Sequence, residues 1–296
     1  MQRLLAFWLC MLFLPGIGQG QQQPKTFVVK PVRDFSLMST GIVLYGSAAV
    51  VSRDPVLTYA DLESLDSQMK LPWPDRYAKN RWSVHADHAS TVVPYMMAGI
   101  VGLYPWLWKR QDEVSNNRWQ QAQTLGLMYA EAWLIQAGVK DWLKEMVSRP
   151  RPFLLGHLLT DTEKIEQAGT DGMRSFPSGH ASGAWMTASF LTTIAMLSRQ
   201  GKKRTWLVPV VMGSAALTTT CLRYASGRHY PTDLAAGAFV GMLTGILVPV
   251  LHLQNHENRS KTVGFVPRIS GGRCGLTLFA QGVFDSGRNN INIGMP

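Results

Sequence analysis

Six stretches of the chain are apolar and almost free of charge, and none shows the sustained alternation of a half-buried strand. They are residues 37–51, 89–108, 121–139, 181–197, 206–222 and 234–251. Each is long enough for a helix, so the pattern predicts an all-helical core. A helix that is apolar on every side is buried in protein or in lipid. The pattern therefore leaves open whether the helices form a soluble bundle or cross a membrane.

Polar segments separate and follow these stretches. They are residues 52–88, the loop 149–176 and a tail 255–296 that is rich in Gly, Asn and Arg. Within the tail, residues 275–284 have a β-like pattern that fits a terminal strand or a loose end. The predicted fold class is all-α, with a six-helix bundle over residues 37–252 and an irregular or β-like tail over residues 253–296.

The first twenty residues have the pattern of a secretory signal peptide. Arg3 gives a charged start, residues 4–14 are apolar, and small residues follow them. The apolar run is too short to span a bilayer comfortably. We expect residues 1–20 to be a signal peptide and residues 21–36 to be an N-terminal tail, in a protein exported to the bacterial cell envelope. An uncleaved anchor is the alternative.

Composition adds a low charge density and an excess of base. Of 296 residues, 46% are hydrophobic and 16% are charged, and 29 Lys and Arg stand against 19 Asp and Glu. The surplus suits nucleic acid, an anionic membrane surface or phosphate-bearing substrates. Only Cys10, Cys221 and Cys274 occur, which excludes a small fold held by disulfides. The mean hydropathy is close to zero, which is low for six membrane spans.

Phosphate-friendly residues gather at the ends of the apolar stretches. Lys144 and Arg151 follow the third stretch, seven positions apart, next to prolines that end a helix. Ser178, Gly179 and His180 precede the fourth stretch, where Ser is a good N-cap and Gly allows close approach of a ligand to the backbone. Free N–H groups at a helix start attract anions. Taken singly, these clusters also fit a solvated helix end and an ordinary cap.

A third cluster links the fifth and sixth stretches and contains Arg223, His229 and Asp233. Pro231 fits the first position of the last helix, which places Asp233 in the first turn. The four-residue offset lets the Asp233 carboxylate reach an imidazole N–H of His229. Such a contact fixes the tautomer and raises the basicity of the other ring nitrogen. Capping alone is the simpler explanation of Asp233.

An up-and-down bundle brings the three clusters to one end. The end of the third helix, the start of the fourth and the link between the fifth and sixth all lie there. Cations and N–H groups at that end can bind a tetrahedral oxyanion. One histidine can attack it while the other protonates the leaving oxygen.

The three clusters resemble the signature motifs of the type 2 phosphatidic acid phosphatase and vanadium haloperoxidase superfamily. They read Lys144-x6-Arg151-Pro152, Pro177-Ser178-Gly179-His180 and Arg223-x5-His229-x3-Asp233. The resemblance implies that His229 is the nucleophile that forms a phosphohistidine, that Asp233 orients it and that His180 is the general acid. It implies that phosphate is held, without metal or cofactor, by Lys144, Arg151, Ser178, Gly179 and Arg223. Leu222 departs from the family, which usually has Ser there, and we expect this to affect the support of Arg223.

The expected function is a phosphatase for phosphomonoesters or diphosphates, on lipid or isoprenoid carriers if the protein lies in a membrane, with vanadate as an inhibitor. The alternatives are a soluble periplasmic nonspecific acid phosphatase, a vanadium-dependent haloperoxidase and a noncatalytic phosphoanion-binding membrane protein. Nucleic-acid binding is disfavoured because the basic residues lie at apolar helix ends and form no basic-aromatic groove pattern.

Other polar residues have less defined roles. Arg149 is expected to be a supporting cation, and Arg228 is expected to shape the pocket. A metal-ligand trio is suggested by His85, Asp87 and His88, but no second cluster completes it. No partners are evident in the sequence for His157, His252 and His256.

Charge bias predicts an orientation if the bundle spans a membrane. The loops 109–118 and 199–204 at the non-catalytic end are basic, whereas residues 140–174 hold six basic and six acidic residues. The positive-inside rule then places the active site on the periplasmic side. A cleaved signal followed by six spans gives the opposite orientation. We favour a membrane-embedded or membrane-associated protein and keep the soluble form open.

Overall fold

The computed structural model describes residues 27–253, except for 53–56, 69, 108–117 and 199–204, and also the segments 262–270 and 273–281. Its helices are α2 (Pro31–Val51), α3 (Tyr59–Gln68), α4 (Val84–Leu107), α5 (Arg118–Val147), α6 (Asp161–Ala168), α7 (Gly179–Leu197), α8 (Leu207–Ala225) and α9 (Pro231–Leu251), with short 3₁₀ turns at Ala78–Asn80 and Pro152–Leu155. The described parts of all six apolar stretches are helical, apart from Trp206 immediately before α8. The predicted signal peptide (1–20) lies outside the described residues.

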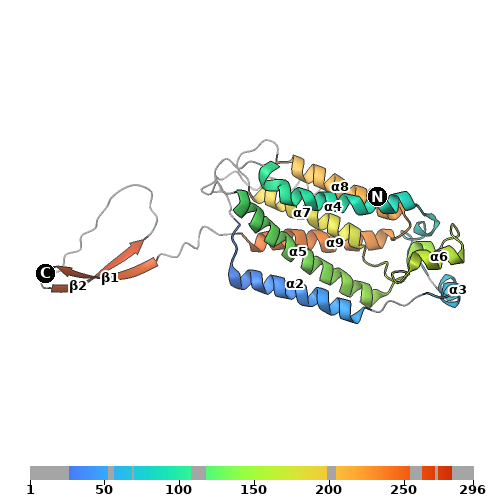
Figure 1. Cartoon of the computed structure of the whole chain (residues 1–296), viewed down its shortest axis with the longest axis horizontal. Coiled ribbons are helices and arrows are strands. Elements are labelled where there is room, and N and C mark those ends of the chain that lie inside the picture. Colours follow the sequence, from blue (N-terminus) through green and yellow to red (C-terminus); the bar gives the residue numbers. More distant parts are fainter. Residues whose placement is uncertain are drawn as a thin grey trace. The chain divides into compact units, whose positions relative to one another are not determined.

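The long helices run side by side, with α7 and α9 between α4, α5 and α8 (Figure 1). Two sequence expectations need correction. Helix α2 begins at Pro31, so residues 31–36 are helical and not part of a tail, because proline suits the first position and Asp34 Oδ2 accepts the Lys30 N–H at 2.7 Å. Short helices α3 and α6 also occur in segments that the polar pattern left as loops.

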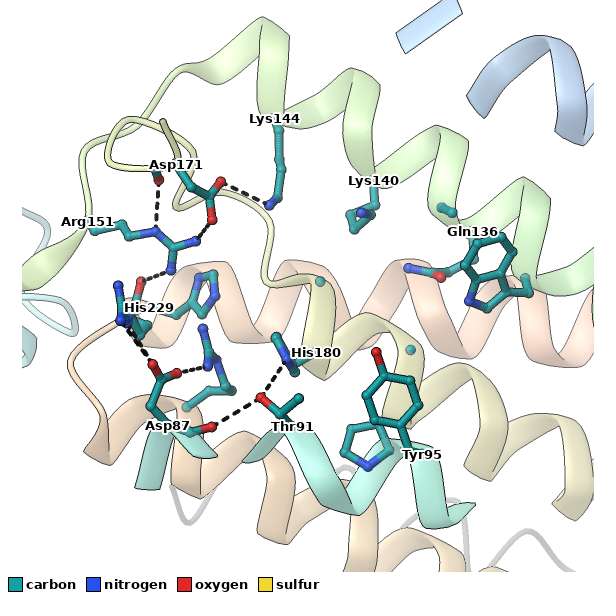
Figure 2. A pocket seen from close by; sticks show the side chains of 17 residues that line it. Asp87, Thr91, Tyr95, Gln136, Lys140, Lys144, Arg151, Asp171, His180 and His229 are labelled. Atoms are coloured by element: carbon teal, nitrogen blue, oxygen red, sulfur yellow. Dashed lines mark hydrogen bonds and ion pairs between the residues drawn. The ribbon is translucent and has the colours of Figure 1, made fainter. Parts of the chain in front are cut away.

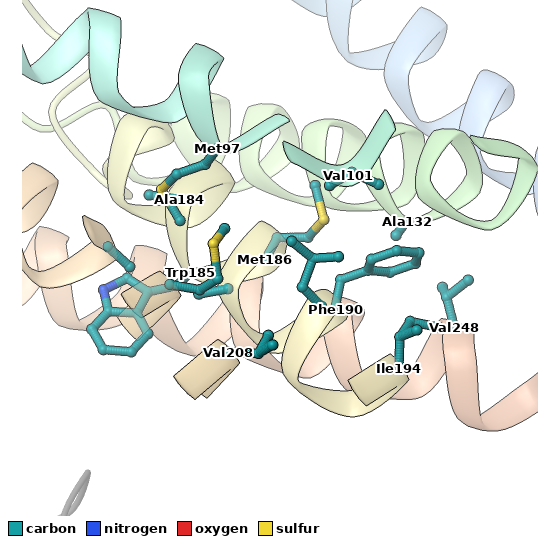
Figure 3. Close-up of a cluster of buried hydrophobic side chains, with 14 of the residues drawn as sticks. Met97, Val101, Ala132, Ala184, Trp185, Met186, Phe190, Ile194, Val208 and Val248 are labelled. Atoms are coloured by element: carbon teal, nitrogen blue, oxygen red, sulfur yellow. The ribbon is translucent and has the colours of Figure 1, made fainter. Parts of the chain in front are cut away.

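The core is built around α7. Met186 and Phe190 of this helix are fully buried and pack with Met97 of α4 and Val248 of α9 (Figure 3). An apolar helix enclosed on all sides needs no polar face. This explains why the fourth apolar stretch carries no charge.

Helix α9 packs unusually close to α7 through three glycines, Gly237, Gly241 and Gly245. A Cβ atom at Gly241 would lie 2.1 Å from the Ser182 carbonyl oxygen, and one at Gly237 would lie 2.4 Å from the Ser178 carbonyl oxygen. Only glycine permits this approach, because the obstructing atoms are backbone. The contact at Ser178 brings the starts of α7 and α9 together, where the second and third motifs lie.

We expect Gly241→Ala to lower the melting temperature because the added methyl group forces the two helices apart. Overpacking costs about 1–3 kcal/mol, against a gain of about 1 kcal/mol in helix propensity. Gly126→Ala on α5 is the control, since no heavy atom lies within 4 Å of its added Cβ. Calorimetry of both variants checks this, and a Gly241→Ala variant as stable as the control would contradict the packing account.

Two of the described helices, α2 and α9, are long and apolar enough to cross a membrane by length and composition. In α2 the apolar side chains are largely exposed, among them Val32, Phe35, Val43 and Val50. An apolar helix face without protein cover needs another apolar environment. This face favours association of the protein with a membrane.

The chain divides after Gln254 into two compact units. In the second unit, β1 (Thr262–Ser270) and β2 (Arg273–Gln281) form an antiparallel pair, with Ser270 opposite Arg273. The β-like segment predicted from residue 275 is therefore a strand as far as Gln281. Its last residues, 282–284, lie outside the described part of the chain.

Candidate active site

A cavity of about 520 Å³ opens where α5 ends and α7 begins. Of the eight site residues predicted from sequence, six line it: Lys144, Arg151, Gly179, His180, Arg223 and His229 (Figure 2). Ser178 and Asp233 are buried behind this lining, each 0% exposed. The structure thus brings the three motifs together at one end of the bundle.

The first motif contributes two cations that share one carboxylate. Lys144 lies in the last turn of α5, and Arg151 follows the helix in extended backbone. Arg151 forms an ion pair with Asp171 and donates to its carbonyl oxygen at 2.9 Å, while Lys144 Nζ lies 3.7 Å from Asp171 Oδ1. Burial lowers the pKa of Lys144 to about 8, although Asp171 opposes this shift. Lys144 therefore remains mostly protonated at neutral pH.

A second carboxylate, that of Asp87 on α4, pairs with the third motif. It binds Arg223 and lies 3.0 Å from Arg228 (Figure 2). Burial raises the pKa of Asp87, but the two guanidinium groups more than offset this, so the pKa lies below its usual value. Asp87 was a candidate metal ligand in the sequence. In the structure it neutralises two cations of the pocket, as Asp171 does on the other side.

His180 projects into the cavity from the first turn of α7. Ser178 caps this helix, because its Oγ accepts the Ala181 N–H. The first N–H groups of a helix have no partner within it and attract anions. His180 Nε2 lies 3.3 Å from Thr91 Oγ1. Burial, together with the charge of Arg223, lowers the pKa of His180 to about 4, so the ring is neutral at pH 7.

The direct hydrogen bond expected between His229 and Asp233 is not formed. His229 Nδ1 lies 3.9 Å from Asp233 Oδ2 and instead donates to the Ser175 carbonyl oxygen at 2.7 Å. The Asp233 carboxylate accepts from Ser175 Oγ and from the Tyr230 N–H. Ser175 therefore links the two residues, because its hydroxyl binds the Asp233 carboxylate and its carbonyl oxygen binds the His229 ring. Because a carbonyl oxygen only accepts hydrogen bonds, His229 Nδ1 carries the proton and Nε2 of the neutral ring has the lone pair.

Arg149 holds Asp233 from the other side. Its guanidinium donates to Asp233 Oδ1 at 2.6 Å and to Asp75 Oδ2 at 2.8 Å, and it lies over the Tyr230 ring, 4.0 Å from the centroid. Asp75 and Asp233 are both 0% exposed. Buried carboxylates need such partners because removing a charge from water is costly. The expected supporting cation is present, and its partner Asp75 had no signal in the sequence.

The other half of the cavity is less charged. Tyr95 of α4 and Gln136 of α5 lie away from Arg151 and Asp171, beyond His180 (Figure 2). Pro94 and Trp133 also line the cavity, and both Tyr95 and Trp133 are more than 40% exposed. The cavity therefore joins a cationic end to an aromatic one.

Because His180 and His229 are neutral in the folded protein, we expect the protein to become less stable in mild acid. Burial and the neighbouring arginines lower the pKa of both His180 and His229, so the unfolded chain binds more protons than the folded one below about pH 6.5. Stability then falls as the pH drops from the unfolded pKa toward the folded pKa. We expect the ligand-free protein to melt at a lower temperature at pH 5 than at pH 7, with a smaller difference in His180→Asn. An equal difference in the variant would contradict the assignment.

Comparisons with known proteins agree with the motifs. Residues 125–257 match the PAP2 superfamily. A probable diacylglycerol pyrophosphate phosphatase 1 of Schizosaccharomyces pombe is 29% identical over 147 residues, which cover 42% of this chain and 51% of that protein. The chain thus spans about half the length of this curated relative. The predicted family resemblance is confirmed.

A solved structure is also similar to this chain. It is the crystal structure of a transmembrane PAP2 type phosphatidylglycerolphosphate phosphatase from Bacillus subtilis, 20% identical, with a TM-score of 0.39. The match covers 74% of this chain and 94% of that one.

Proposed function

We propose that this chain is a phosphatase that hydrolyses phosphomonoesters or diphosphates of lipid or isoprenoid carriers. Its resemblance to the PAP2 superfamily supports a phosphatase. The supporting observation is a single cavity in which buried His229 and half-buried His180 face cationic side chains. The cavity lining contains five of these cations: Lys140, Lys144, Arg151, Arg223 and Arg228. Binding a phosphate requires only the cations and N–H groups. The two histidines add a nucleophile and an acid, which favour catalysis over a noncatalytic role.

Substrate phosphate enters by replacing carboxylates. Asp87 forms an ion pair with Arg223, and Asp171 forms one with Arg151. A phosphate dianion can present its oxygens to the same two guanidinium groups in place of the carboxylates. Arg151 and Arg223 are each 4% exposed, so their charges act in a region with little water to screen them. The bound phosphate also cancels the positive field that lowers the pKa of His180, so the ring can take up a proton.

In the first step, His229 Nε2 attacks phosphorus. A bond forms between Nε2 and phosphorus while the bond from phosphorus to the leaving oxygen breaks, and His180 gives that oxygen its proton. The Ser175 carbonyl oxygen, 2.7 Å from Nδ1, stabilises the positive imidazole that results. The cations stabilise the charge on the equatorial oxygens.

In the second step, water attacks the phosphohistidine. The bond from nitrogen to phosphorus breaks, neutral His180 accepts a proton from the water, and inorganic phosphate leaves. The electron pair returns to Nε2, which restores the starting ring. These steps use only side chains and backbone groups of this chain.

A lipid substrate is favoured by the aromatic half of the cavity. Tyr95, which is 75% exposed, and Trp133, which is 44% exposed, line it. An acyl or prenyl chain can lie against these rings while the phosphate occupies the cationic end. The curated relative described above is a probable diacylglycerol pyrophosphate phosphatase, whose name also indicates a lipid substrate. We place the active site on the periplasmic side of a membrane-associated protein.

A release assay on purified protein tests the proposal. The substrates are phosphatidate, a prenyl diphosphate, phosphatidylglycerolphosphate and a soluble aryl phosphate, each with and without vanadate. We expect release from a lipid substrate and inhibition by vanadate. Release from the aryl phosphate alone would indicate a nonspecific acid phosphatase, and bromide oxidation with vanadate would indicate a haloperoxidase. No phosphate from any substrate would refute the proposal.

A further inference from the structure

A second group of buried polar side chains lies at the end of the bundle away from the cavity. Asp34 belongs to the first turn of α2, Glu131 to the middle of α5 and His252 to the C-cap of α9. Asp34 is 4% exposed, and Glu131 and His252 are 0% exposed. Helix α9 has 21 residues, about 30 Å of helix, between this group and the third motif. The group therefore takes no part in the phosphate site.

The geometry at His252 brings three acceptors together. Nδ1 lies 2.8 Å from the Val248 carbonyl oxygen, so it carries the proton and Nε2 of the neutral ring has a lone pair. This Nε2 lies 3.2 Å from Glu131 Oε2 and 3.3 Å from Asp34 Oδ1. Among the described residues, neither Glu131 oxygen nor His252 Nε2 has a hydrogen-bond partner. Lone pairs that face one another at this distance require a proton or a metal cation between them.

The neighbouring charges leave one carboxylate uncompensated. Arg33 Nε donates to Asp34 Oδ1 at 2.6 Å, and the Lys30 N–H donates to Oδ2 at 2.7 Å. These contacts satisfy Asp34, but Glu131 receives no comparable donor. A bare carboxylate in an enclosed position is expensive.

We propose that Asp34, Glu131 and His252 bind a divalent transition-metal ion of the Zn²⁺ class. A tetrahedral ion about 2.1 Å from each ligand atom places those atoms about 3.4 Å apart. The separations of His252 Nε2 from the Glu131 and Asp34 oxygens, 3.2 and 3.3 Å, fit this geometry, and all three ligand atoms lie within 4.8 Å of one another. An imidazole with two carboxylates suits Zn²⁺ and its neighbours better than Mg²⁺ or Ca²⁺. Water completes the coordination.

The groups around the ligands fit this assignment. The Val248 carbonyl fixes the tautomer of His252, and Arg33 with the Lys30 N–H fixes the Asp34 carboxylate. Metal ligands in proteins are oriented by such hydrogen bonds. The site joins three helices, so the ion fastens α2 to α5 and α9. This contact matters because α2 exposes much of its apolar surface.

The test is metal binding by the untagged full-length protein. After treatment with chelator, the protein is titrated with Zn²⁺ and, for its visible absorption, with Co²⁺. We expect one equivalent bound and a rise in melting temperature. Glu131→Gln keeps the shape but removes the charge, and we expect it to weaken affinity by more than about 100-fold, since losing even a residue that only orients a ligand costs 10–100-fold.

His157→Ala is the matched control, because His157 is exposed and lies away from the cluster. It should bind Zn²⁺ as the wild type does. Asp34→Asn provides a second ligand variant if Glu131→Gln does not fold. The proposal is wrong if the wild type retains no metal above background, which would indicate that a proton is shared at this position. It is also wrong if both ligand variants bind as tightly as the control.

Discussion

Replacing His229 with alanine is expected to lower phosphate release by about 10⁴-fold or more, because the variant has no nucleophile in the cavity. The cations that hold phosphate are unchanged, so binding of the anion should survive. The measurement is the release rate under single-turnover conditions, together with the shift in melting temperature caused by inorganic phosphate. We expect the rate to collapse and the phosphate-dependent shift to remain.

The control for this variant is His85→Ala. His85 lies on α4 close to Asp87 but is exposed, and it does not line the cavity. Its replacement should leave release within about twofold of the wild type, as surface substitutions usually change little. A His229→Ala variant that releases phosphate at the rate of this control would remove His229 from the mechanism.

Asp233→Asn is expected to cause the second largest loss, about 10²–10³-fold in kcat, less than the ~10⁴-fold seen when a direct carboxylate partner of a catalytic histidine becomes an amide. The contact here is indirect, through Ser175. The amide also weakens the pair with Arg149, whose Nη1 lies 2.6 Å from Asp233 Oδ1. The variant should therefore lose stability as well as rate.

Ser175→Ala tests whether Asp233 acts on His229 through Ser175. It keeps the carbonyl that binds His229 but removes the hydroxyl that binds Asp233. If Asp233 acts through Ser175, the rate losses of the two single variants overlap, and the double variant is little worse than Asp233→Asn alone. Fully additive losses would show that Asp233 acts by a different route. The pH dependence of kcat should shift in both single variants, whereas a merely structural defect would leave it unchanged.

The helices and the meeting of the three motifs could be predicted because helix ends have local signals. Ser178 is a cap, Pro231 starts a helix and the apolar runs mark the helices between them. These signals fix which end of the bundle each motif occupies, and bundle topology then brings the motifs together. The prediction needed no knowledge of long-range contacts.

The missing parts of the site depend on contacts that no local pattern marks. Asp87 and Asp171 come from polar segments, and only the folded chain places them against Arg223 and Arg151. The Ser175 carbonyl that binds His229 is a backbone atom, so no residue type points to it.

The grouping of Asp34, Glu131 and His252 could not be predicted for the same reason. Each residue comes from a different helix or helix end, and the three are widely separated in the chain. Nothing in the sequence around His252 indicates that it has partners.

The covalent intermediate tests the central claim most directly. Purified protein is mixed with phosphatidate labelled in its phosphate, quenched in alkali within milliseconds and digested for peptide mapping. The account predicts label on the peptide that contains His229, lost on brief exposure to acid and absent from His229→Ala. Label on a different side chain, or wild-type release by His229→Ala, would contradict it.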